Sequence, residues 1–465
     1  MFFKHFYDED LAQGSYLIGC QATGDAIVVD ARRDIQVFID EAERNGLTIN
    51  HVTETHIHAD YLSGSRELAA VTGATLYLSD EGNADWKYGF EGVKLYHNDV
   101  IKVGNLRVTA VHTPGHTPEH LSFLVADGAK TEEPGFYLTG DFVFVGDIGR
   151  PDLLDEAAGG IDTRFVGAKQ LFQSLRDRFL NLPDYVQVWP AHGAGSACGK
   201  ELGAVASTTV GYERLFSWWA SYIDNDDEQG FVDALLSGQP DAPLYFGRMK
   251  RQNKAGPALL GDRPALEHLP PQELASRGDA IVLVDTRSRE AYGQGHVPGV
   301  LHIPAGKQFA TYASYIIDPE RETRPIIVSA DNAEQAQALR DKLTYIGIDN
   351  CVGYCSSFDG LKLEPSATIS PQALEQQSDT FILDVRTKNE HEAGNVPGAT
   401  QLHAGRLLWH MDKLPQDKNA PVVVHCQSGA RAAVAASALR AAGYKQVLEL
   451  EGSYEGWQAA QTVTA

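Results

Sequence analysis

An internal repeat in the second half of the chain constrains the fold more than any other feature. Asp285-Thr286-Arg287 is followed by a Val-Pro-Gly turn, and Asp384-Val385-Arg386, 99 residues later, is followed by the same turn at the same spacing. A short apolar strand precedes each copy, and helical segments follow. Strands that alternate with helices predict two small parallel α/β domains, which we place at residues 265–364 and 365–465.

The 465 residues are enough for about three domains. Residues 1–245 alternate β-rich runs with polar turns and helical segments, so they predict a separate, larger α/β domain. The expected strands are 25–30, 75–78 and 106–111, and the expected helices are 165–180 and 208–223. Residues 246–264 are basic, contain Gly and Pro and show no periodicity, which is typical of a linker.

Charge and composition exclude several classes of function. Acidic residues number 62 and basic residues 39, giving a net charge of −23, which disfavours nucleic acid as a partner. No apolar run is long enough to span a bilayer, and the N-terminal region becomes acidic before a signal-peptide core could form. We therefore expect a cytoplasmic protein without a membrane partner. Its five cysteines are expected to be reduced thiols.

Histidine and aspartate side chains recur where predicted strands give way to turns in the first domain. His56, His58 and Asp60 follow one such strand, and His112, Asp141 and His192 each follow another. Imidazole and carboxylate groups that converge at strand ends are typical of a metal site.

These motifs, HxHxD, a TPGHT loop, TGD and PAH, resemble the metallo-β-lactamase superfamily. THIHADYLSG and GDFVFVGDIGRPD are most similar to its persulfide dioxygenase branch. The resemblance implies a four-layer αββα sandwich and one non-haem Fe(II) per chain, held by His56, His112 and Asp141. In this interpretation His116 and His120 orient their loop instead of binding metal. Two imidazoles and one carboxylate leave positions on Fe(II) open for substrate sulfur and O₂.

Four further residues bear on the number of metals. His58, Asp60 and His192 match positions that form a second metal site in hydrolytic relatives, and Tyr61 stands where those relatives carry another His. A phenol, with a pKa of about 10, is a poor ligand at neutral pH. The sequence therefore favours one metal over two.

Two residues near the predicted metal site have open interpretations. Arg150 matches an arginine that the family places near its thiol substrate, and it could bind a carboxylate of a glutathione-like persulfide. A salt bridge to Asp147 or Asp152 is the alternative. Cys198 lies just beyond His192 and is either a redox thiol that carries a persulfide or a buried, inert cysteine.

The second repeat contains a cysteine loop. Cys426 follows the apolar strand 422–425, and Arg431 begins an Ala-rich helix. The loop between them consists of Gln427, Ser428, Gly429 and Ala430. Backbone N–H groups in such a loop stabilise a thiolate or cradle an oxyanion.

This loop and the Asp-Val-Arg and Val-Pro-Gly motifs resemble the rhodanese family of sulfurtransferases, which are three-layer α/β domains. The resemblance implies that Cys426 carries sulfane sulfur and that Arg431 closes the loop. The first repeat has Ala330 opposite Cys426 and Gln335 opposite Arg431, so we predict an inactive copy. Its Cys351 and Cys355 are expected to be buried structural residues.

The order of domains resembles bacterial fusions of a persulfide dioxygenase with an inactive and an active rhodanese copy. The resemblance implies oxidation of thiol persulfide with O₂ to sulfite, then conversion of sulfite and persulfide sulfur to thiosulfate. It also implies a homo-oligomer. One rival is a zinc-dependent thioester hydrolase resembling glyoxalase II with an accessory sulfur carrier. The other is a non-catalytic, sulfide-responsive binding protein.

Overall fold

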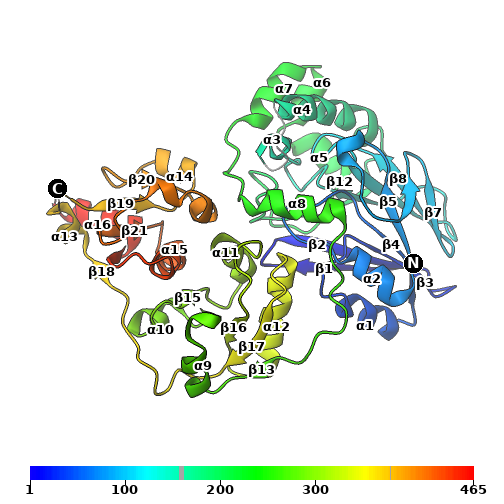
Figure 1. The fold of residues 1–465 in the computed structure, drawn as a ribbon. Coiled ribbons are helices and arrows are strands. Elements are labelled where there is room, and N and C mark those ends of the chain that lie inside the picture. The colour runs from blue at the N-terminus through cyan, green and yellow to red at the C-terminus, as the bar shows by residue number, and fades with distance from the viewer. Residues whose placement is uncertain (157–161, 378, 465) are drawn as a thin grey trace. The chain divides into compact units, whose positions relative to one another are not determined.

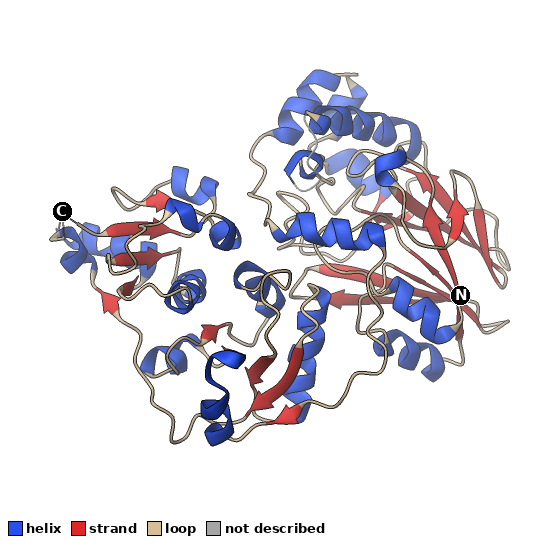
Figure 2. Cartoon of the chain, in the orientation of Figure 1, coloured by secondary structure: helices blue, strands red, loops and turns tan. Residues whose placement is uncertain are grey.

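The computed structural model describes residues 1–156, 162–377 and 379–464. The chain forms two compact units, one of residues 1–242 and 246–261 and one of residues 243–245 and 262–465. Both units contain helices and strands (Figures 1 and 2). Among the described residues, no helix combines the length and the hydrophobicity needed to cross a bilayer.

Two six-stranded sheets form the centre of the first unit. The first sheet is, in order, β1 (Phe2–Asp8), β2 (Gln13–Gly19), β3 (Asp25–Val29), β4 (Thr48–Thr53), β5 (Thr75–Ser79) and β6 (Val93–Leu95). The second is β12 (Thr208–Thr209), β11 (Gln187–Pro190), β10 (Phe136–Gly140), β9 (Leu121–Asp127), β8 (Leu106–His112) and β7 (Val100–Val103). Strands β3 to β6 are mutually parallel, whereas β7 to β10 are antiparallel.

Helices cover the outer faces of these sheets, which confirms the predicted αββα sandwich. Buried Ile18, Val108 and Phe123 pack together between the sheets. Phe38 of α1 (Gln36–Arg44) and Leu68 of α2 (Ser65–Thr72) pack on the first sheet. The helical elements after β10 are α3 (Leu153–Glu156), α4 (Thr163–Ser174), the π-helix η2 (Leu175–Phe179), α5 (Val210–Phe216), α6 (Ala220–Asp224) and α7 (Glu228–Leu236), and a short 3₁₀ turn, η1, covers Ala84–Trp86.

The expected strands and helices of this unit are present, with two differences. The helix expected at 165–180 begins at Thr163 and changes to π-helical geometry after Ser174. The helix expected at 208–223 is broken into α5 and α6, because Ser217 adopts an extended conformation. Trp219 follows the break and is fully buried against Phe179.

The segment predicted as a linker, 246–264, is largely ordered structure. Helix α8 covers Tyr245–Ala255, and residues 246–261 belong to the first unit. Phe246, Met249 and Asn253 of α8 are buried. The linker prediction missed these residues because the basic and polar side chains between them hide a buried helical face.

The second unit contains two five-stranded parallel sheets with the same strand order, as the repeat predicts. The first copy has β13 (Glu267–His268), β17 (Cys351–Cys355), β16 (Ile326–Ser329), β14 (Val282–Asp285) and β15 (Leu301–His302). The second has β18 (Thr368–Ile369), β22 (Val447–Leu450), β21 (Val422–His425), β19 (Phe381–Asp384) and β20 (Thr400–Gln401).

Helices flank each of these sheets (Figure 1). Those of the first copy are α9 (Pro271–Arg277), η3 (Gly278–Ala280), α10 (Arg289–Gln294), α11 (Phe309–Ile316) and α12 (Ala333–Tyr345). Those of the second are α13 (Pro371–Glu375), α14 (Lys388–Glu392), η4 (Ala404–Trp409), η5 (Met411–Lys413), α15 (Ala430–Ala441) and α16 (Ser453–Thr464).

Candidate metal centre and cysteine loop

Two histidines and one aspartate converge at the carboxyl ends of strands in the first unit. His56 follows β4, His116 follows β8 and Asp141 follows β10, and one donor atom of each lies within 4.8 Å of the others. All three side chains are buried. Burial lowers the pKa of both imidazoles, so each ring is neutral and has a lone pair to offer a metal ion.

Hydrogen bonds from the surrounding chain orient these three groups. The Nδ1 atom of His116 lies 3.0 Å from the carbonyl oxygen of Arg150, which leaves Nε2 to face Asp141 at 3.4 Å. The backbone N–H of Asp141 donates to Nε2 of His120 at 3.0 Å. His120 therefore orients its surroundings, as predicted. Hydrogen bonds of this kind fix the direction of a ligand before metal binds.

His116, and not the predicted His112, completes this group. His112 is the last residue of β8, where its backbone still pairs with β9, and its Nε2 lies 2.8 Å from the carbonyl oxygen of Pro118. The chain then turns at Gly115, whose φ of +149° and close approach to Leu171 admit only glycine. This turn brings His116 into the cluster. The ligand set implied by the resemblance contains His112, whereas the structure brings His116 to His56 and Asp141.

A second group lies beside the first and consists of Asp60, His192 and Cys198. The Nε2 atom of His192 is 3.3 Å from an Asp60 oxygen and 3.5 Å from an Asp141 oxygen. Cys198 is buried, and burial raises the pKa of its thiol well above the usual value. It is therefore a protonated thiol inside the cluster and not an exposed residue.

His58 and Tyr61 do not join either group. The Nε2 atom of His58 lies 3.0 Å from an Asp30 oxygen. Burial would lower the pKa of His58, but Asp30 reverses the effect and raises it to about 9. The Tyr61 hydroxyl donates to the carbonyl oxygen of Asp30 at 3.3 Å. Of the residues predicted for a second metal site, the structure brings together Asp60 and His192 only.

The environment of Asp141 fits a bound cation. Ring nitrogens of His56, His116 and His192 lie 3.4 to 3.9 Å from its carboxylate. Both carboxylate oxygens are buried and accept no hydrogen bond from the described residues. Buried carboxylates without hydrogen bonds are costly, and a metal ion among these donors would remove that cost. The His56, His116 and Asp141 set suits Fe(II), and all its donors also suit zinc.

Arg150 forms the ion pair that the sequence left as the alternative to substrate binding. Its guanidinium is buried, binds both carboxylate oxygens of Asp152, and donates to the carbonyl oxygen of Ala197 at 3.1 Å. The pair fixes the backbone next to His116, since the Arg150 carbonyl accepts from that ring. The structure thus gives Arg150 a positioning role at the cluster.

In the second unit, Cys426 lies at the carboxyl end of β21, at the start of a tight loop. The backbone N–H of Gly429 points at Sγ of Cys426 at a distance of 3.1 Å. The Cys426 N–H donates to the hydroxyl of Ser453 at 3.3 Å. Helix α15 begins at Ala430, so the sulfur lies at the N-terminal end of a 12-residue helix. This is the predicted cradle for an anionic sulfur.

The arginine that closes the loop is held by an acid that the sequence analysis missed. Arg431 donates two parallel hydrogen bonds to Glu390, at 2.8 and 2.7 Å. Glu390 also caps α14 through Thr387. A second pair, between Arg386 and Asp384, lies under the loop, and Arg386 donates to the side chain of Gln427 at 3.3 Å. The capping pattern Thr-x-x-Glu at 387–390 was the available signal for Glu390.

The first copy has no cysteine at the position that corresponds to Cys426. Ala330 follows β16 at the position that Cys426 occupies after β21. The side chain of Gln335 accepts a hydrogen bond from the Asp331 N–H at 2.6 Å, so this backbone N–H is already paired within the turn. Cys351 and Cys355 are buried.

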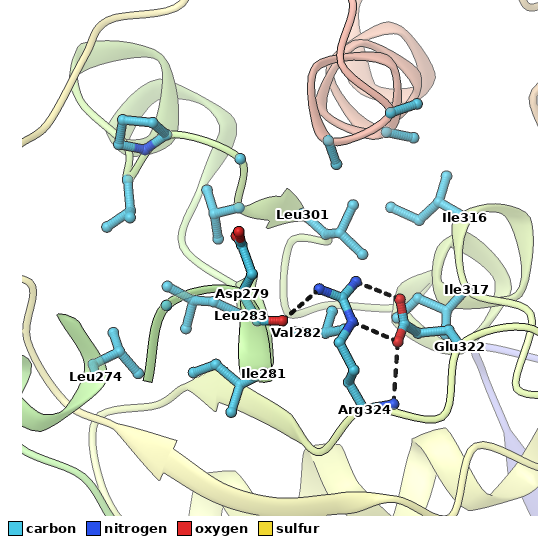
Figure 3. A pocket seen from close by; sticks show the side chains of 18 of the residues that line it. Leu274, Asp279, Ile281, Val282, Leu283, Leu301, Ile316, Ile317, Glu322 and Arg324 are labelled. Atoms are coloured by element: carbon cyan, nitrogen blue, oxygen red, sulfur yellow. Dashed lines mark hydrogen bonds and ion pairs between the residues drawn. The ribbon is translucent and has the colours of Figure 1, made fainter. Parts of the chain in front are cut away.

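A cavity of about 590 Å³, whose lining does not include Cys426, lies in the second unit (Figure 3). Its walls are mainly apolar and include Leu283, Leu301 and Ile316. Arg324, at its edge, is paired with Glu322 and donates to the carbonyl oxygen of Asp279 at 3.0 Å. No cysteine or histidine among the described residues lines this cavity.

Models of known protein families match both halves of the chain. A family model described as "Metallo-beta-lactamase superfamily" matches residues 10–192. A model described as "Rhodanese-like domain" matches residues 271–362 and again 370–460.

Individual relatives agree with this division. A crystal structure of a metallo-beta-lactamase from Staphylococcus aureus is 41% identical, with a TM-score of 0.68, over 76% of this chain and 98% of that one. Two hydroxyacylglutathione hydrolases match the first part. The cytoplasmic enzyme of Arabidopsis thaliana is 33% identical over 60% of this chain and 95% of its own length. The enzyme of Rhodospirillum rubrum is 29% identical over 51% of this chain and 80% of its own length. The chain therefore belongs to the metallo-beta-lactamase superfamily, and its metallo-beta-lactamase domain is followed by two rhodanese-like domains.

Proposed function

We propose that this protein oxidises a low-molecular-weight thiol persulfide at the metal centre and transfers sulfane sulfur at Cys426. His56, His116 and Asp141 would hold one Fe(II) per chain. In the overall first reaction, persulfide, O₂ and water give thiol, sulfite and two protons. In the second, sulfite takes a sulfur atom from the persulfide of Cys426, and the product is thiosulfate.

The ligand set supports the first reaction. Two neutral imidazoles and one carboxylate form the facial set typical of non-haem Fe(II) oxygenases, and Fe(II) there would supply the redox chemistry. His116 is held in direction by the Arg150 carbonyl, and Asp141 by its N–H bond to His120. The surrounding buried side chains keep bulk water from the reacting groups.

The presence of the Cys426 loop in the same chain is the observation that carries the proposal. A rhodanese-type thiol needs a donor and an acceptor of sulfane sulfur. Persulfide oxidation produces sulfite, which is such an acceptor, and uses the same persulfide that charges Cys426. Thioester hydrolysis supplies neither compound. The small-molecule partners would thus be thiol persulfides, O₂ and sulfite.

Two observations favour a second candidate, a zinc-dependent thioesterase. Asp60, His192 and Cys198 offer three donor atoms beside the first group, and two hydroxyacylglutathione hydrolases are among the similar proteins. A two-zinc hydrolase would use both groups. The mononuclear interpretation is supported by His58, which is paired with Asp30 and outside both groups.

Metal analysis and oxygen uptake distinguish the two candidates. Protein purified without oxygen should contain one iron per chain and should consume O₂ with glutathione persulfide or coenzyme A persulfide. A hydroxyacylglutathione thioester serves as the control substrate. Two zinc ions per chain, with thioester hydrolysis and no O₂ uptake, would overturn the dioxygenase assignment. Binding of persulfide without turnover would indicate the non-catalytic, sulfide-responsive protein.

A further inference from the structure

The inactive rhodanese copy places a cation on the Cys426 loop. Arg289 is the first residue of α10 in that copy, and its Nη1 donates to the carbonyl oxygen of Ser428 at 3.0 Å. Its guanidinium lies so close to Gly429 that a Cβ atom there would overlap it. Gly429 also has a φ of +111°, a backbone conformation that favours glycine.

The loop's own arginines are neutralised by acids. Arg431 is paired with Glu390 through two hydrogen bonds, and Arg386 is paired with buried Asp384. Arg289 differs, because no carboxylate of the described residues lies within ion-pair distance of it. Among the described residues its hydrogen-bond partner is the neutral carbonyl of Ser428, and its charge also acts on the adjacent, exposed Glu290 carboxylate. A guanidinium without a direct ion pair beside the loop attracts an anion, and its planar fork suits an oxyanion.

A second element of the inactive copy packs against the helix that follows the loop. Helix α11, on which the largely buried Tyr312 lies, contacts α15, and α15 begins at Ala430. In the first copy, α10 therefore contacts the Cys426 loop and α11 contacts the helix that the loop leads into.

We propose that Arg289 binds the oxyanion group of the anionic sulfur acceptor at Cys426, so that the inactive copy supplies acceptor specificity to the active one. This inference rests on the proposed function, in which sulfite is the acceptor. The sulfur lone pair of sulfite attacks the outer sulfur of the Cys426 persulfide anion. The S–S bond of the persulfide breaks, the Cys426 thiolate leaves, and thiosulfate carries away the transferred sulfur. Charge balances, with three negative charges on each side.

Repulsion between two anions is the obstacle in this step. Sulfite is a dianion at neutral to alkaline pH, and the deprotonated persulfide is also negative. The Gly429 N–H and the α15 N-terminus favour the charge on the cysteine sulfur. Arg289 would attract the incoming dianion from the solvent side of the loop, where Ser428 is exposed.

Single-turnover discharge of the full-length protein tests this role. Cys426 is loaded with sulfur from glutathione persulfide without O₂, excess donor is removed, and discharge to sulfite or to neutral 2-mercaptoethanol is timed. Cys426→Ser gives the background. Loss of a charge-assisted contact predicts that Arg289→Gln slows discharge to sulfite by about tenfold and discharge to 2-mercaptoethanol by less than about twofold. Arg289→Lys, which keeps the charge, should recover part of the sulfite rate.

Salt and a matched variant separate binding from a structural effect. Added KCl should slow the sulfite reaction of the wild type more steeply than that of Arg289→Gln, since salt screens the attraction. Arg277→Gln, on exposed α9 of the same copy, should behave as wild type. Equal slowing with both acceptors, or no slowing with sulfite, would overturn the role of Arg289. If Cys426 in wild-type protein gains no sulfur by mass, the proposed function fails along with it.

Discussion

The side-chain nitrogen of Asn253 lies 2.8 Å from the carbonyl oxygen of His58 and 2.7 Å from that of Tyr61. Its side-chain oxygen accepts from the Ser63 N–H at 2.9 Å. Asn253 is buried on α8, nearly 200 residues after the loop that it holds. A helix beyond the predicted domain boundary thus fixes the loop that carries His56 and Asp60.

Replacing Asn253 by Ala should weaken metal binding. The substitution leaves two carbonyls and one N–H of a buried loop without partners, so the loop that presents His56 becomes less ordered. We expect the affinity for Fe(II) or a substitute divalent ion to fall about tenfold, measured by chelator competition. Asn225→Ala, in an exposed position, is the control. Unchanged affinity in Asn253→Ala would show that the loop is ordered without α8.

The group of His56, His116 and Asp141 leads to a second prediction. His116→Ala should lose most of the bound metal, because it removes one of three donors, whereas His112→Ala should retain it. Metal content after gel filtration, with circular dichroism to confirm folding, is the measurement. Loss of metal in His112→Ala with retention in His116→Ala would reinstate the sequence assignment.

The sequence predicted the folds well and the metal group only in part. The repeat fixed two equivalent domains because each copy repeats its motifs at one spacing, and both sheets have the same strand order. His56 and Asp141 belong both to the ligand set that the resemblance implies and to the group in the structure. His116 was missed because the end of β8 at His112 depends on pairing with β9.

Helix α8 was missed for a different reason. Phe246, Met249 and Asn253 are spaced three and four apart, which is helical, but Asn253 is polar and its burial depends on partners some 190 residues away. Arg289 is likewise invisible to sequence reasoning, since an arginine in an inactive copy has no local link to Cys426. Contacts between segments that are distant in sequence determine both the burial of Asn253 and the place of Arg289 beside the Cys426 loop.

The ion pair of Glu390 and Arg431 should make stability depend on pH. Burial alone would raise the pKa of Glu390, but hydrogen bonds from Arg431 and the Thr387 backbone lower it to about 2. A depressed folded-state pKa means that the stabilisation is present above the unfolded-state value, about 4.5, and is lost as pH falls toward 2.

Glu390→Gln therefore should destabilise the second unit most near neutral pH. We expect a loss of about 1 kcal/mol at pH 7, because the pair is partly exposed and screened. The difference from wild type should shrink as the pH is lowered from about 5 to about 3. Urea unfolding, followed by tryptophan fluorescence at each pH, measures the difference in free energy of unfolding between the variant and the wild type. A difference that stays constant over this pH range would show that the ion pair does not cause the shift.

The last prediction concerns the order of the two proposed reactions. Both sites belong to one chain, so tethering raises the concentration of the Cys426 loop that sulfite from the same chain meets. Wild-type protein given persulfide and O₂ should therefore release mainly thiosulfate. Cys426→Ser should consume O₂ at a similar initial rate but release mainly sulfite, because sulfite then meets no charged thiol.

Derivatisation with a thiol-reactive reagent quantifies the sulfite and thiosulfate that are released. O₂ uptake, recorded on the same samples, measures the oxidation step. Ala330→Ser, in the inactive copy, is the matched control and should give the wild-type product ratio, because no nucleophile is lost. If Cys426→Ser still yields thiosulfate at the wild-type ratio, after subtraction of the non-enzymatic reaction, the sites do not act in series. If O₂ uptake collapses instead, Cys426 acts before the metal centre, since only a step upstream of oxidation can limit oxygen consumption.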